Sequence, residues 1–553
     1  MTTLEKSPAT RGSTPPKDFD AVIVGAGFAG MYMLHRLRGL GFSARVFEAG
    51  TGVGGTWYWN RYPGARCDVE SLDYQYSFSD DLQKEWNWTE RHATQPEILV
   101  YANHVADKFD LRRDIQFETR ITSAVFDEKV NRWAVGTDRG DRLSAKFLIS
   151  ATGCLSAARM PDFKGLDTFT GKWFHTGHWP HEGVDFTGKR VGIIGTGSSA
   201  IQSIPVIARQ AAHLTVFQRT PNFSLPANNE SLTPEKIKKY KENFAEIKRM
   251  ARESAGGVNV APREESALQV AQDEREREFE ARWGQGGFYL LQAYIDLLAT
   301  NEANETVAEF VRNKIRQVVK NPAVAEMLAP KDHPLGTKRI CIDSEYFETY
   351  NRDNVTLVNI RNAPIEEITP KGLRTGGKEY EFDIIVFATG FDAMTGALLN
   401  MGVRGKGGQT LKEKWAAGPR TYLGLQSAGF PNMFMITGPG SPSVLSNMII
   451  SIEQHVDWIA DCMTYMREKH LGTIEATTPA EDAWVEHVNE LANQTLYPQA
   501  NSWYLGANVP GKPRVFMPYV GGVGTYRVKC AEVAANGYEG FSLGAGDRVP
   551  ARA

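Results

Sequence analysis

The sequence predicts an α/β protein with two Rossmann-like domains and a helical insertion. Three observations support this fold class. Two glycine-rich fingerprints each lie between a short apolar strand and a helix pattern, and a long charged stretch of helical character follows the second one. With 553 residues, of which 42% are apolar, the chain can fill several hydrophobic cores.

The first fingerprint follows a short apolar strand and reads Gly25-x-Gly27-x-x-Gly30. A helix pattern and a second strand over residues 44–47, with Glu48 at its end, complete a βαβ unit. In such a unit the first glycine permits the tight turn, the second lets the backbone approach a pyrophosphate, and the third allows close packing of helix on strand. Glu48 can accept hydrogen bonds from ribose hydroxyls, and a second glycine pair at 54–55 suits the adenosine half of FAD.

The second fingerprint reads Gly195-x-Gly197-x-x-Ala200, between a strand at residues 190–194 and a helix pattern. Its second strand, at residues 214–217, ends without an acidic residue, and Gln218, Arg219 and Thr220 follow it. A carboxylate there would repel a 2′-phosphate, whereas Arg219 can bind one through two hydrogen bonds and Thr220 can donate another. This site is therefore predicted to prefer NADP.

Between the second fingerprint and the strand "IIVF" lies a charged stretch, roughly residues 225–329, that we interpret as a helical insertion over a cleft. Two strands end in Ala-Thr-Gly, at 151–153 and 388–390. We interpret these segments as the points where the chain leaves and re-enters the flavin domain.

Composition excludes several partners. Lys plus Arg total 62 and Asp plus Glu total 65, so a net charge of −3 provides no basic field, and no nucleic acid is expected. No apolar run approaches the roughly 20 residues of a membrane helix, so no membrane partner is expected. The polar leader, residues 1–17, lacks the apolar core of a signal peptide and is expected to be disordered. We expect a cytoplasmic protein and a monomer, with an oligomer left open.

The five cysteines are far apart in the sequence and form no C-x-x-C pair, which favours a reducing compartment. They are Cys67, Cys154, Cys341, Cys462 and Cys530. Two cofactor sites imply that electrons pass between cofactors and then to a disulfide, a protein partner or oxygen. The absent cysteine pair removes the disulfide. Reduced flavin can form a C4a-peroxide with oxygen in a dry pocket, and a fixed cation would keep that peroxide anionic.

The stretch "FTGKWFHTGHWP" carries His175 and His178, and His181 follows it at the same spacing. Three histidines at this spacing could bind zinc on a helix, but Gly171 and Pro180 oppose a regular helix and no nearby group completes four ligands. We therefore expect no metal. The alternative is an aromatic linker packed between domains, with its histidines hydrogen-bonded.

The pattern Phe169-x-Gly171-x-x-x-His175-x-x-x-Trp179-Pro180, placed between two dinucleotide fingerprints, resembles the signature of the type I Baeyer-Villiger monooxygenases. Supporting stretches are "GVGGTWYWNRYPGARCDVES", "GTKR", "ATGFDAMTGAL", "GPGSPSVLSNM" and "NSWYLGANVPGKPRVF". The similarity runs from about residue 18 to 544, and among the members the chain resembles the phenylacetone and steroid monooxygenases.

The resemblance implies an FAD- and NADPH-dependent enzyme that inserts one oxygen atom from O2 beside a ketone carbonyl. The product is an ester or lactone, formed through a C4a-peroxyflavin anion, and sulfides are expected to be oxidised as well. The implied division of the chain is an FAD domain at 18–150 and 388–545, an NADP domain with linkers at 151–224 and 330–387, and the insertion at 225–329.

The resemblance also assigns residues. Arg339 would be the active-site cation and Asp68 its partner, while His175 and Trp179 would couple domain motion to cofactor binding. FAD contacts would be Gly25, Gly27, Ala29, Gly30, Glu48, Thr56, Trp57, Tyr58, Trp59, Asp68, Tyr74, Ile121 and Met448. NADP contacts would be Gly195, Thr196, Gly197, Ser198, Ser199, Ala200, Ile201, Gln202, Arg219, Thr220, Lys338, Arg339 and Trp503, the last on a mobile lid. The substrate pocket would include Cys154, Met394, Ser443, Val444 and Leu445, where differences from the family bear on the ketone.

Two other functions fit the same fingerprints. One is a flavin-containing monooxygenase that oxidises amines or sulfides, which would not need the Asp68 and Arg339 pair. The other is a non-catalytic flavoprotein that senses NADPH and turns nothing over.

Overall fold

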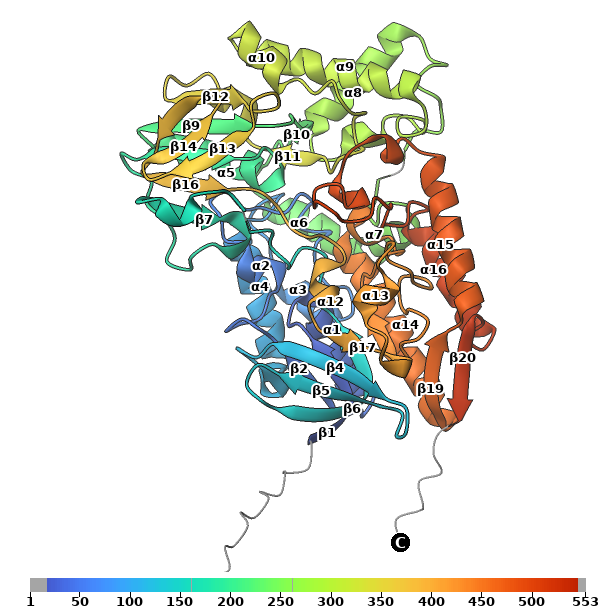
Figure 1. The fold of residues 1–553 in the computed structure, drawn as a ribbon. Helices are drawn as coiled ribbons and strands as arrows, with labels where there is room; N and C mark the ends of the chain where they lie inside the picture. The colour runs from blue at the N-terminus through green and yellow to red at the C-terminus, as the bar shows by residue number, and fades with distance from the viewer. Residues whose placement is uncertain (1–16, 161, 261, 546–553) are drawn as a thin grey trace, which may run out of the picture.

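Two sheets with helices packed against them make up most of the protein, of which the computed structural model describes residues 17–160, 162–260 and 262–545 (Figure 1). Of the leader predicted at 1–17, only Lys17 is among the described residues, as the first residue of β1. The fold is the α/β class that the fingerprints predict.

The first sheet has eight strands and is built from both ends of the chain. Strands β6, β1, β2 and β3 run parallel in that order, and β4 and β5 pair antiparallel beyond β6. Strands β17 and β18 reach the sheet from the C-terminal half and pair with β4 and β6. The strands are β1 (Lys17–Val24), β2 (Ala44–Phe47), β3 (Ile115–Gln116), β4 (Ile121–Asp127), β5 (Arg132–Thr137), β6 (Arg142–Ser150), β17 (Val403–Arg404) and β18 (Met433–Met435).

The second sheet has five strands, all parallel, in the order β12, β9, β8, β16, β7. A small antiparallel sheet of β13, β14 and β15 is inserted between β12 and β16 in the chain. These strands are β7 (Lys172–His175), β8 (Arg190–Ile194), β9 (His213–Gln218), β12 (Val355–Asn359), β13 (Ile365–Thr369), β14 (Gly372–Thr375), β15 (Lys378–Glu381) and β16 (Ile384–Phe387). The sequence pattern predicts β8 to the residue and β9 to within one residue at each end.

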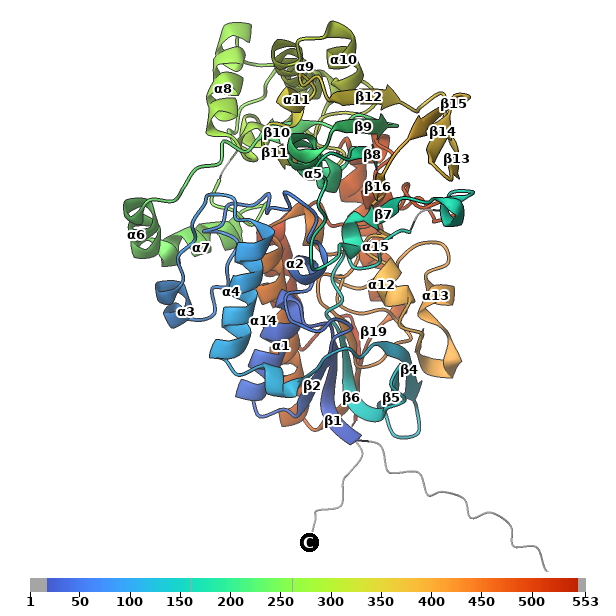
Figure 2. The same cartoon turned by 90° about the vertical axis from the view of Figure 1, so that its left-hand side faces the viewer.

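The stretch between β9 and β12 of the second sheet is helical. It contacts both parts of the protein, the first part being built around the first sheet and the second part around the second sheet (Figure 2). Tyr240 and Lys241 of α6 donate to the backbone carbonyls of Leu72 and Lys84 in the first part. Helices α8 and α9 instead share a hydrophobic core with the second sheet. The segment starts with β10 (Ser224–Pro226), which pairs with β11 (Cys341–Asp343), and holds α6 (Pro234–Glu242), α7 (Phe244–Glu253), α8 (Gln272–Gln285), α9 (Asn301–Val318) and α10 (Pro322–Leu328).

The remaining helices cover the two sheets and their edges. Helices α1 and α14 pack side by side in the largest hydrophobic core (Figure 1). The other elements are α1 (Phe28–Gly39), α2 (Thr56–Trp59), α3 (Asp80–Glu85), α4 (Gln95–Lys108), α5 (Ser198–Gln210), α11 (Tyr346–Thr349), α12 (Gly396–Leu399), α13 (Leu411–Lys414), α14 (Met448–Glu468), β19 (Leu471–Ala476), α15 (Thr478–Asn493), α16 (Val523–Ala535) and β20 (Phe541–Ala545). Among the described residues, no helix has the length and apolar character needed to cross a bilayer.

The two Ala-Thr-Gly segments occupy equivalent positions in the two parts. A Cβ atom on Gly25 would lie 2.6 Å from the carbonyl oxygen of Ala151, and one on Gly195 would lie 2.6 Å from that of Ala388. Each crossing segment therefore packs against the first glycine of one fingerprint. Both of these glycines also have positive φ, 104° and 112°, which side-chain-bearing residues rarely adopt.

Beyond these glycines the two crossing segments run alongside each other. The Arg159 amide donates to the carbonyl of Gly390, and the Met394 amide donates to that of Cys154, at 3.0 and 2.9 Å. Cys154, at the start of the first segment, is thereby fixed to the second one. Residues 154–159 and 390–394 thus form a short double connection between the parts.

Gly30 offers a test of the first βαβ unit. A Cβ atom there would lie 1.8 Å from the carbonyl oxygen of Gly25, so Gly30→Ala cannot be accommodated without moving helix α1 off its strand. We expect a loss of about 3 kcal/mol or more in the free energy of unfolding, measured by urea denaturation. Gly39→Ala, in the same helix, meets no atom within 4 Å and should leave that free energy unchanged or raised. Equal stability of the two variants would contradict the packing argument.

Candidate active site

The N-terminus of α1 fits a bound pyrophosphate. Gly27 is the N-cap of this helix, and no side chain caps the first amides. A Cβ atom on Gly55 would lie 2.8 Å from Cα of Gly27, so the backbones of the two glycine loops meet here. Free amides at a helix N-terminus between backbone-only walls suit a phosphate group. The Glu48 carboxylate is buried and accepts the amides of Ala26 and Gly50 at 2.8 and 2.7 Å, which fixes both loops.

The other residues predicted to contact FAD lie on several elements. Thr56, Trp57, Tyr58 and Trp59 form α2, and the Trp57 indole donates to the Tyr74 hydroxyl at 3.1 Å. Ala29 and Gly30 are buried in the first turn of α1, Ile121 begins β4 and Met448 begins α14.

The N-terminus of α5 forms a second cradle of the same design. Its N-cap is Gly197, again without a side-chain cap, and a Cβ atom on Gly197 would meet nothing within 4 Å. This open space before the helix suits a second pyrophosphate. The hydroxyls of Ser198 and Ser199 lie 3.2 Å from Cys341 Sγ and 3.0 Å from the Thr176 hydroxyl, while Ala200 and Ile201 are buried beneath them.

Cationic side chains gather beside this second cradle. Arg219 and Thr220 follow β9, and the Thr196 hydroxyl donates to the Thr220 carbonyl at 2.8 Å. Burial lowers the pKa of Lys338, and the positive charge of Arg219 lowers it further. The structure therefore brings together the residues predicted to hold a 2′-phosphate.

Arg339 and Asp68 form an ion pair between segments 271 residues apart in the chain, with Nη2 and Oδ2 separated by 3.1 Å. Arg339 Nη1 also donates to the carbonyl of Val444 at 3.2 Å. Burial raises the pKa of the Asp68 carboxyl, and Arg339 lowers it part of the way back. Burial alone would lower the pKa of Arg339, but Asp68 reverses that effect and raises it, so the guanidinium stays charged.

Gln202 connects α5 to the ion pair. Its side-chain amide donates to Arg66 O at 3.1 Å and approaches Asp68 Oδ1 at 3.4 Å, and its oxygen accepts from the Tyr62 hydroxyl at 2.9 Å. The family resemblance predicts Gln202 only as an NADP contact. Its contacts show that the second cradle also reaches the carboxylate that holds Arg339.

The residues predicted for the substrate pocket lie together next to the ion pair. Cys154, Met394 and Val444 are buried in one small core, with Leu445 and Trp503 packed against it. The Cys154 thiol lies 3.1 Å from the Ser443 hydroxyl and 3.4 Å from the carbonyl of Thr437. Met394, Thr437 and Ser443 have positive φ, at 67°, 58° and 39°. Strained non-glycine residues gathered around one thiol are typical of a functional site.

Tyr504 is a site residue that sequence reasoning did not single out. It is buried beside Trp503, with ring centroids 4.4 Å apart, and it belongs to the same small core as Cys154. Burial raises the pKa of Tyr504 to about 12, against the lowering influence of the Arg339 charge. In the sequence, the only indication of a role for Tyr504 is its position directly after Trp503, the predicted lid residue.

The aromatic linker packs between the two parts, as the alternative to a metal site predicts. His175 is buried, accepts the amide of Gly177 at 3.0 Å and pairs with the Thr389 hydroxyl at 3.1 Å. His178 and His181 contact the rings of Trp59 and Tyr58 edge-on. Elsewhere in the linker, Phe169 packs beneath the second sheet, Gly171 is closely packed against Asp383 O, and Trp179 is buried just before Pro180.

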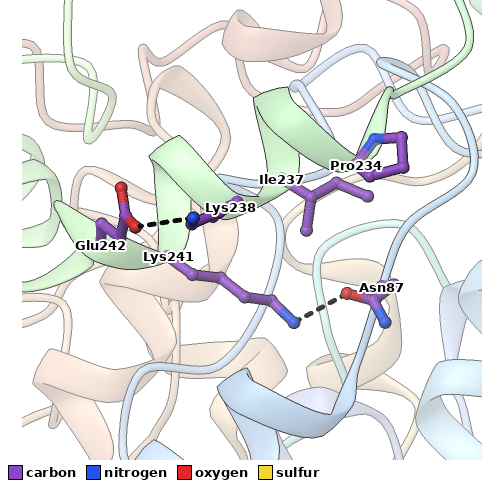
Figure 3. A pocket seen from close by; sticks show the side chains of 6 residues that line it. All are labelled: Asn87, Pro234, Ile237, Lys238, Lys241 and Glu242. Carbon is purple, nitrogen blue, oxygen red and sulfur yellow. Dashed lines mark hydrogen bonds and ion pairs between the residues drawn. The ribbon is translucent and has the colours of Figure 1, made fainter.

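A cavity of about 190 Å³ lies between Asp68 and the helical segment. His92 lines it and is fully buried, and among the described residues neither ring nitrogen has a hydrogen-bond partner of normal geometry. A separate pocket at the surface, between Asn87 and α6, contains none of the predicted site residues (Figure 3).

Comparisons with known proteins agree with this geometry. A family model described as pyridine nucleotide-disulphide oxidoreductase matches residues 22–281. A Baeyer-Villiger monooxygenase of Pseudooceanicola batsensis is 46% identical over 94% of this chain and 95% of its own length. A methyl acetate-forming acetone monooxygenase of Gordonia strain TY-5 is 44% identical over 95% of this chain and 99% of its own. The solved structure of an oxidised steroid monooxygenase bound to NADP has a TM-score of 0.92 at 56% identity, and the match covers 96% of this chain and 100% of that one.

The fold and site define a flavoprotein monooxygenase. Within that class, identity above 40% along almost the whole length shows that the chain belongs to the Baeyer-Villiger monooxygenases. The family predicted from the linker motif is confirmed. All five cysteines are buried and free, so they form none of the disulfides for which the broader family is named.

His92 makes stability sensitive to acid. Burial lowers the pKa of His92 from 6.5 to about 4. The negative charge of Glu70 opposes this shift, and the positive charges of Arg91 and Arg66 add to it. Between these values the unfolded chain binds a proton that the folded protein does not, so stability falls as the pH falls from about 6.5 towards 4. The cost at pH 5 is about 1 to 2 kcal/mol, compared by urea unfolding at pH 7.5 and 5. His92→Phe should remove that part of the loss, whereas His487→Phe, at an exposed position, should not. Equal acid sensitivity in the His92 variant and the wild type would contradict the assignment.

Proposed function

We propose that this chain inserts one oxygen atom of O2 next to the carbonyl of a ketone, using FAD and NADPH, and releases an ester or lactone. The observation that carries the proposal is the Arg339–Asp68 ion pair, which lies where two nucleotide cradles and the Cys154 core meet. The relatives support the substrate class, because one of them is named for forming methyl acetate from acetone.

The two cradles assign the cofactors. FAD is held at the N-terminus of α1, with Glu48 on the adenosine side and α2 beyond it, and NADPH is held at the N-terminus of α5. When bound there, FAD would supply the redox chemistry, with NADPH as the hydride donor and O2 as the oxidant. We assign residues 18–150 and 388–545 to the FAD domain and residues 151–224 and 330–387 to the NADP domain.

Arg339 supplies a permanent positive charge to the reacting atoms. Attack on a ketone carbonyl moves negative charge onto its oxygen, and a fixed guanidinium stabilises that charge without having to reorganise. Asp68 and the Val444 carbonyl bind both ends of the guanidinium fork and hold it in place. Asp68 thus acts as a positioning residue.

The small core around Cys154 forms the substrate side of the site and keeps water out. Its walls are mainly apolar, with the Cys154 thiol beside the Ser443 hydroxyl, and Val444 places the same loop in contact with both the core and Arg339. We assign Trp503 to a lid over this region, with Tyr504 beneath it. We assign the linker that holds His175 and Trp179 to coupling domain motion to the FAD site, and the contacts of the neighbouring His178 and His181 with Trp59 and Tyr58 of α2 support this assignment.

Arg339→Ala is the central test. The wild type should convert ketones to esters or lactones, detected by gas chromatography. The variant should bind FAD and consume NADPH while ester yield falls by at least about 100-fold, because the stabilised charge is lost. Arg190→Ala, which removes an exposed arginine with two carboxylate partners, should leave ester yield unchanged. Normal ester yield without Arg339 would remove this residue from the mechanism, and thioether oxidation without any ester from the wild type would overturn the reaction.

Arg219→Ala tests the coenzyme assignment. Loss of a charge-assisted contact to the 2′-phosphate should raise KM for NADPH about tenfold and leave KM for NADH nearly unchanged. The preference for NADPH therefore narrows, as followed by initial rates with each coenzyme. Arg209→Ala, at the far end of α5 and paired with Glu345, is the matched control. An unchanged preference in the Arg219 variant would show that another group recognises the phosphate.

A further inference from the structure

A third arginine lies in the cationic cluster beside the second cradle, at the end of a different strand. Strands β9 and β12 are parallel neighbours with Gln218 opposite Asn359, and the amide of Ile360 donates to the Gln218 carbonyl at 2.9 Å. The residues after the two strands, Arg219 and Arg361, therefore leave the sheet at the same edge. Arg361 Nε donates to the carbonyl of Arg219 at 3.3 Å.

We propose that Arg361 is a third binding group for the 2′-phosphate of NADPH, together with Arg219 and Lys338. This inference rests on the proposed function, in which the second cradle binds NADPH. It adds a residue that neither the fingerprint nor the linker motif indicates.

Lys338 lies close enough to both arginines for their charges to act on it. Burial lowers the pKa of Lys338 most, Asp332 raises it, and Arg219 and Arg361 each lower it. Like charges collect in this way where an anion is to be bound. The Arg361 side chain is 45% exposed and so can reach a ligand that arrives from solvent.

Asp332 holds Arg361 at this edge. One carboxylate oxygen pairs with the guanidinium of Arg361, and the other lies 2.7 Å from Nδ1 of His333, whose side chain is buried. Three cations and one carboxylate leave about two positive charges, which match the charge of about −1.5 to −2 on a phosphate monoester. Without a ligand, Asp332 offsets part of the repulsion among the cations.

A purely structural role for Arg361 would be to tie the segment after α10 to the sheet through Asp332. The two roles predict different results. A structural tie affects stability and every ligand of the cradle alike, whereas a phosphate contact acts only on ligands that carry the 2′-phosphate.

Isothermal titration of the FAD-loaded protein with 2′,5′-ADP and with 5′-AMP separates these roles. Arg361→Ala should weaken 2′,5′-ADP about five- to tenfold and change 5′-AMP less than twofold, and Arg361→Lys should restore most of the loss. Arg352→Ala is the matched control, because Arg352 is an exposed arginine just before the opposite end of β12. It should bind both nucleotides as the wild type does.

The outcomes distinguish this inference from the function on which it rests. A wild type that does not prefer 2′,5′-ADP over 5′-AMP overturns the NADPH assignment and the role of Arg361 together. A wild type with that preference, and an Arg361→Ala variant that keeps it in full or loses affinity for both nucleotides equally, overturns the role of Arg361 alone.

Discussion

The ion pair between Asp68 and Arg339 is the contact on which the site depends. Asp68 belongs to the first part of the chain, Arg339 follows the helical segment, and the third contact, the Val444 carbonyl, comes from the C-terminal part. Removing two charges from water is costly, and only good geometry with additional hydrogen bonds offsets that cost. The pair therefore depends on the docking of these three segments.

The repeated architecture explains why the site lies between the two parts. In each part a glycine fingerprint turns the backbone so that a helix N-terminus faces outward, and an Ala-Thr-Gly segment crosses against the first glycine. Ligands of open parallel sheets bind at the carboxyl ends of the strands. Because the crossing segments run alongside each other, both edges open towards the same region, where Gln202 and Cys154 lie.

Local patterns in the sequence predict the fold well, because glycine turns, strand lengths and helix periodicity depend on neighbouring residues. They predict β2 and β8 to the residue, and the long linker motif predicts the family. Contacts between distant segments are a different matter. Three of these contacts depend on how sheets and segments dock, which a residue pattern does not predict. Gln202 reaches Asp68, Tyr504 lies near Arg339, and Arg361 contacts Arg219.

The backbone around Cys154 shows how such a scaffold can serve different ketones. Positive φ at Met394, Thr437 and Ser443 persists only because surrounding hydrogen bonds and packing fix these residues. Substitution of their side chains would then alter the volume and polarity of the pocket without moving the loop that also holds Arg339 through Val444. Relatives named for acetone and for steroids, molecules of very different size, are 44% and 56% identical to this chain. Selectivity is therefore expected to reside in the side chains of this core, and the chemistry in the ion pair that the backbone keeps constant.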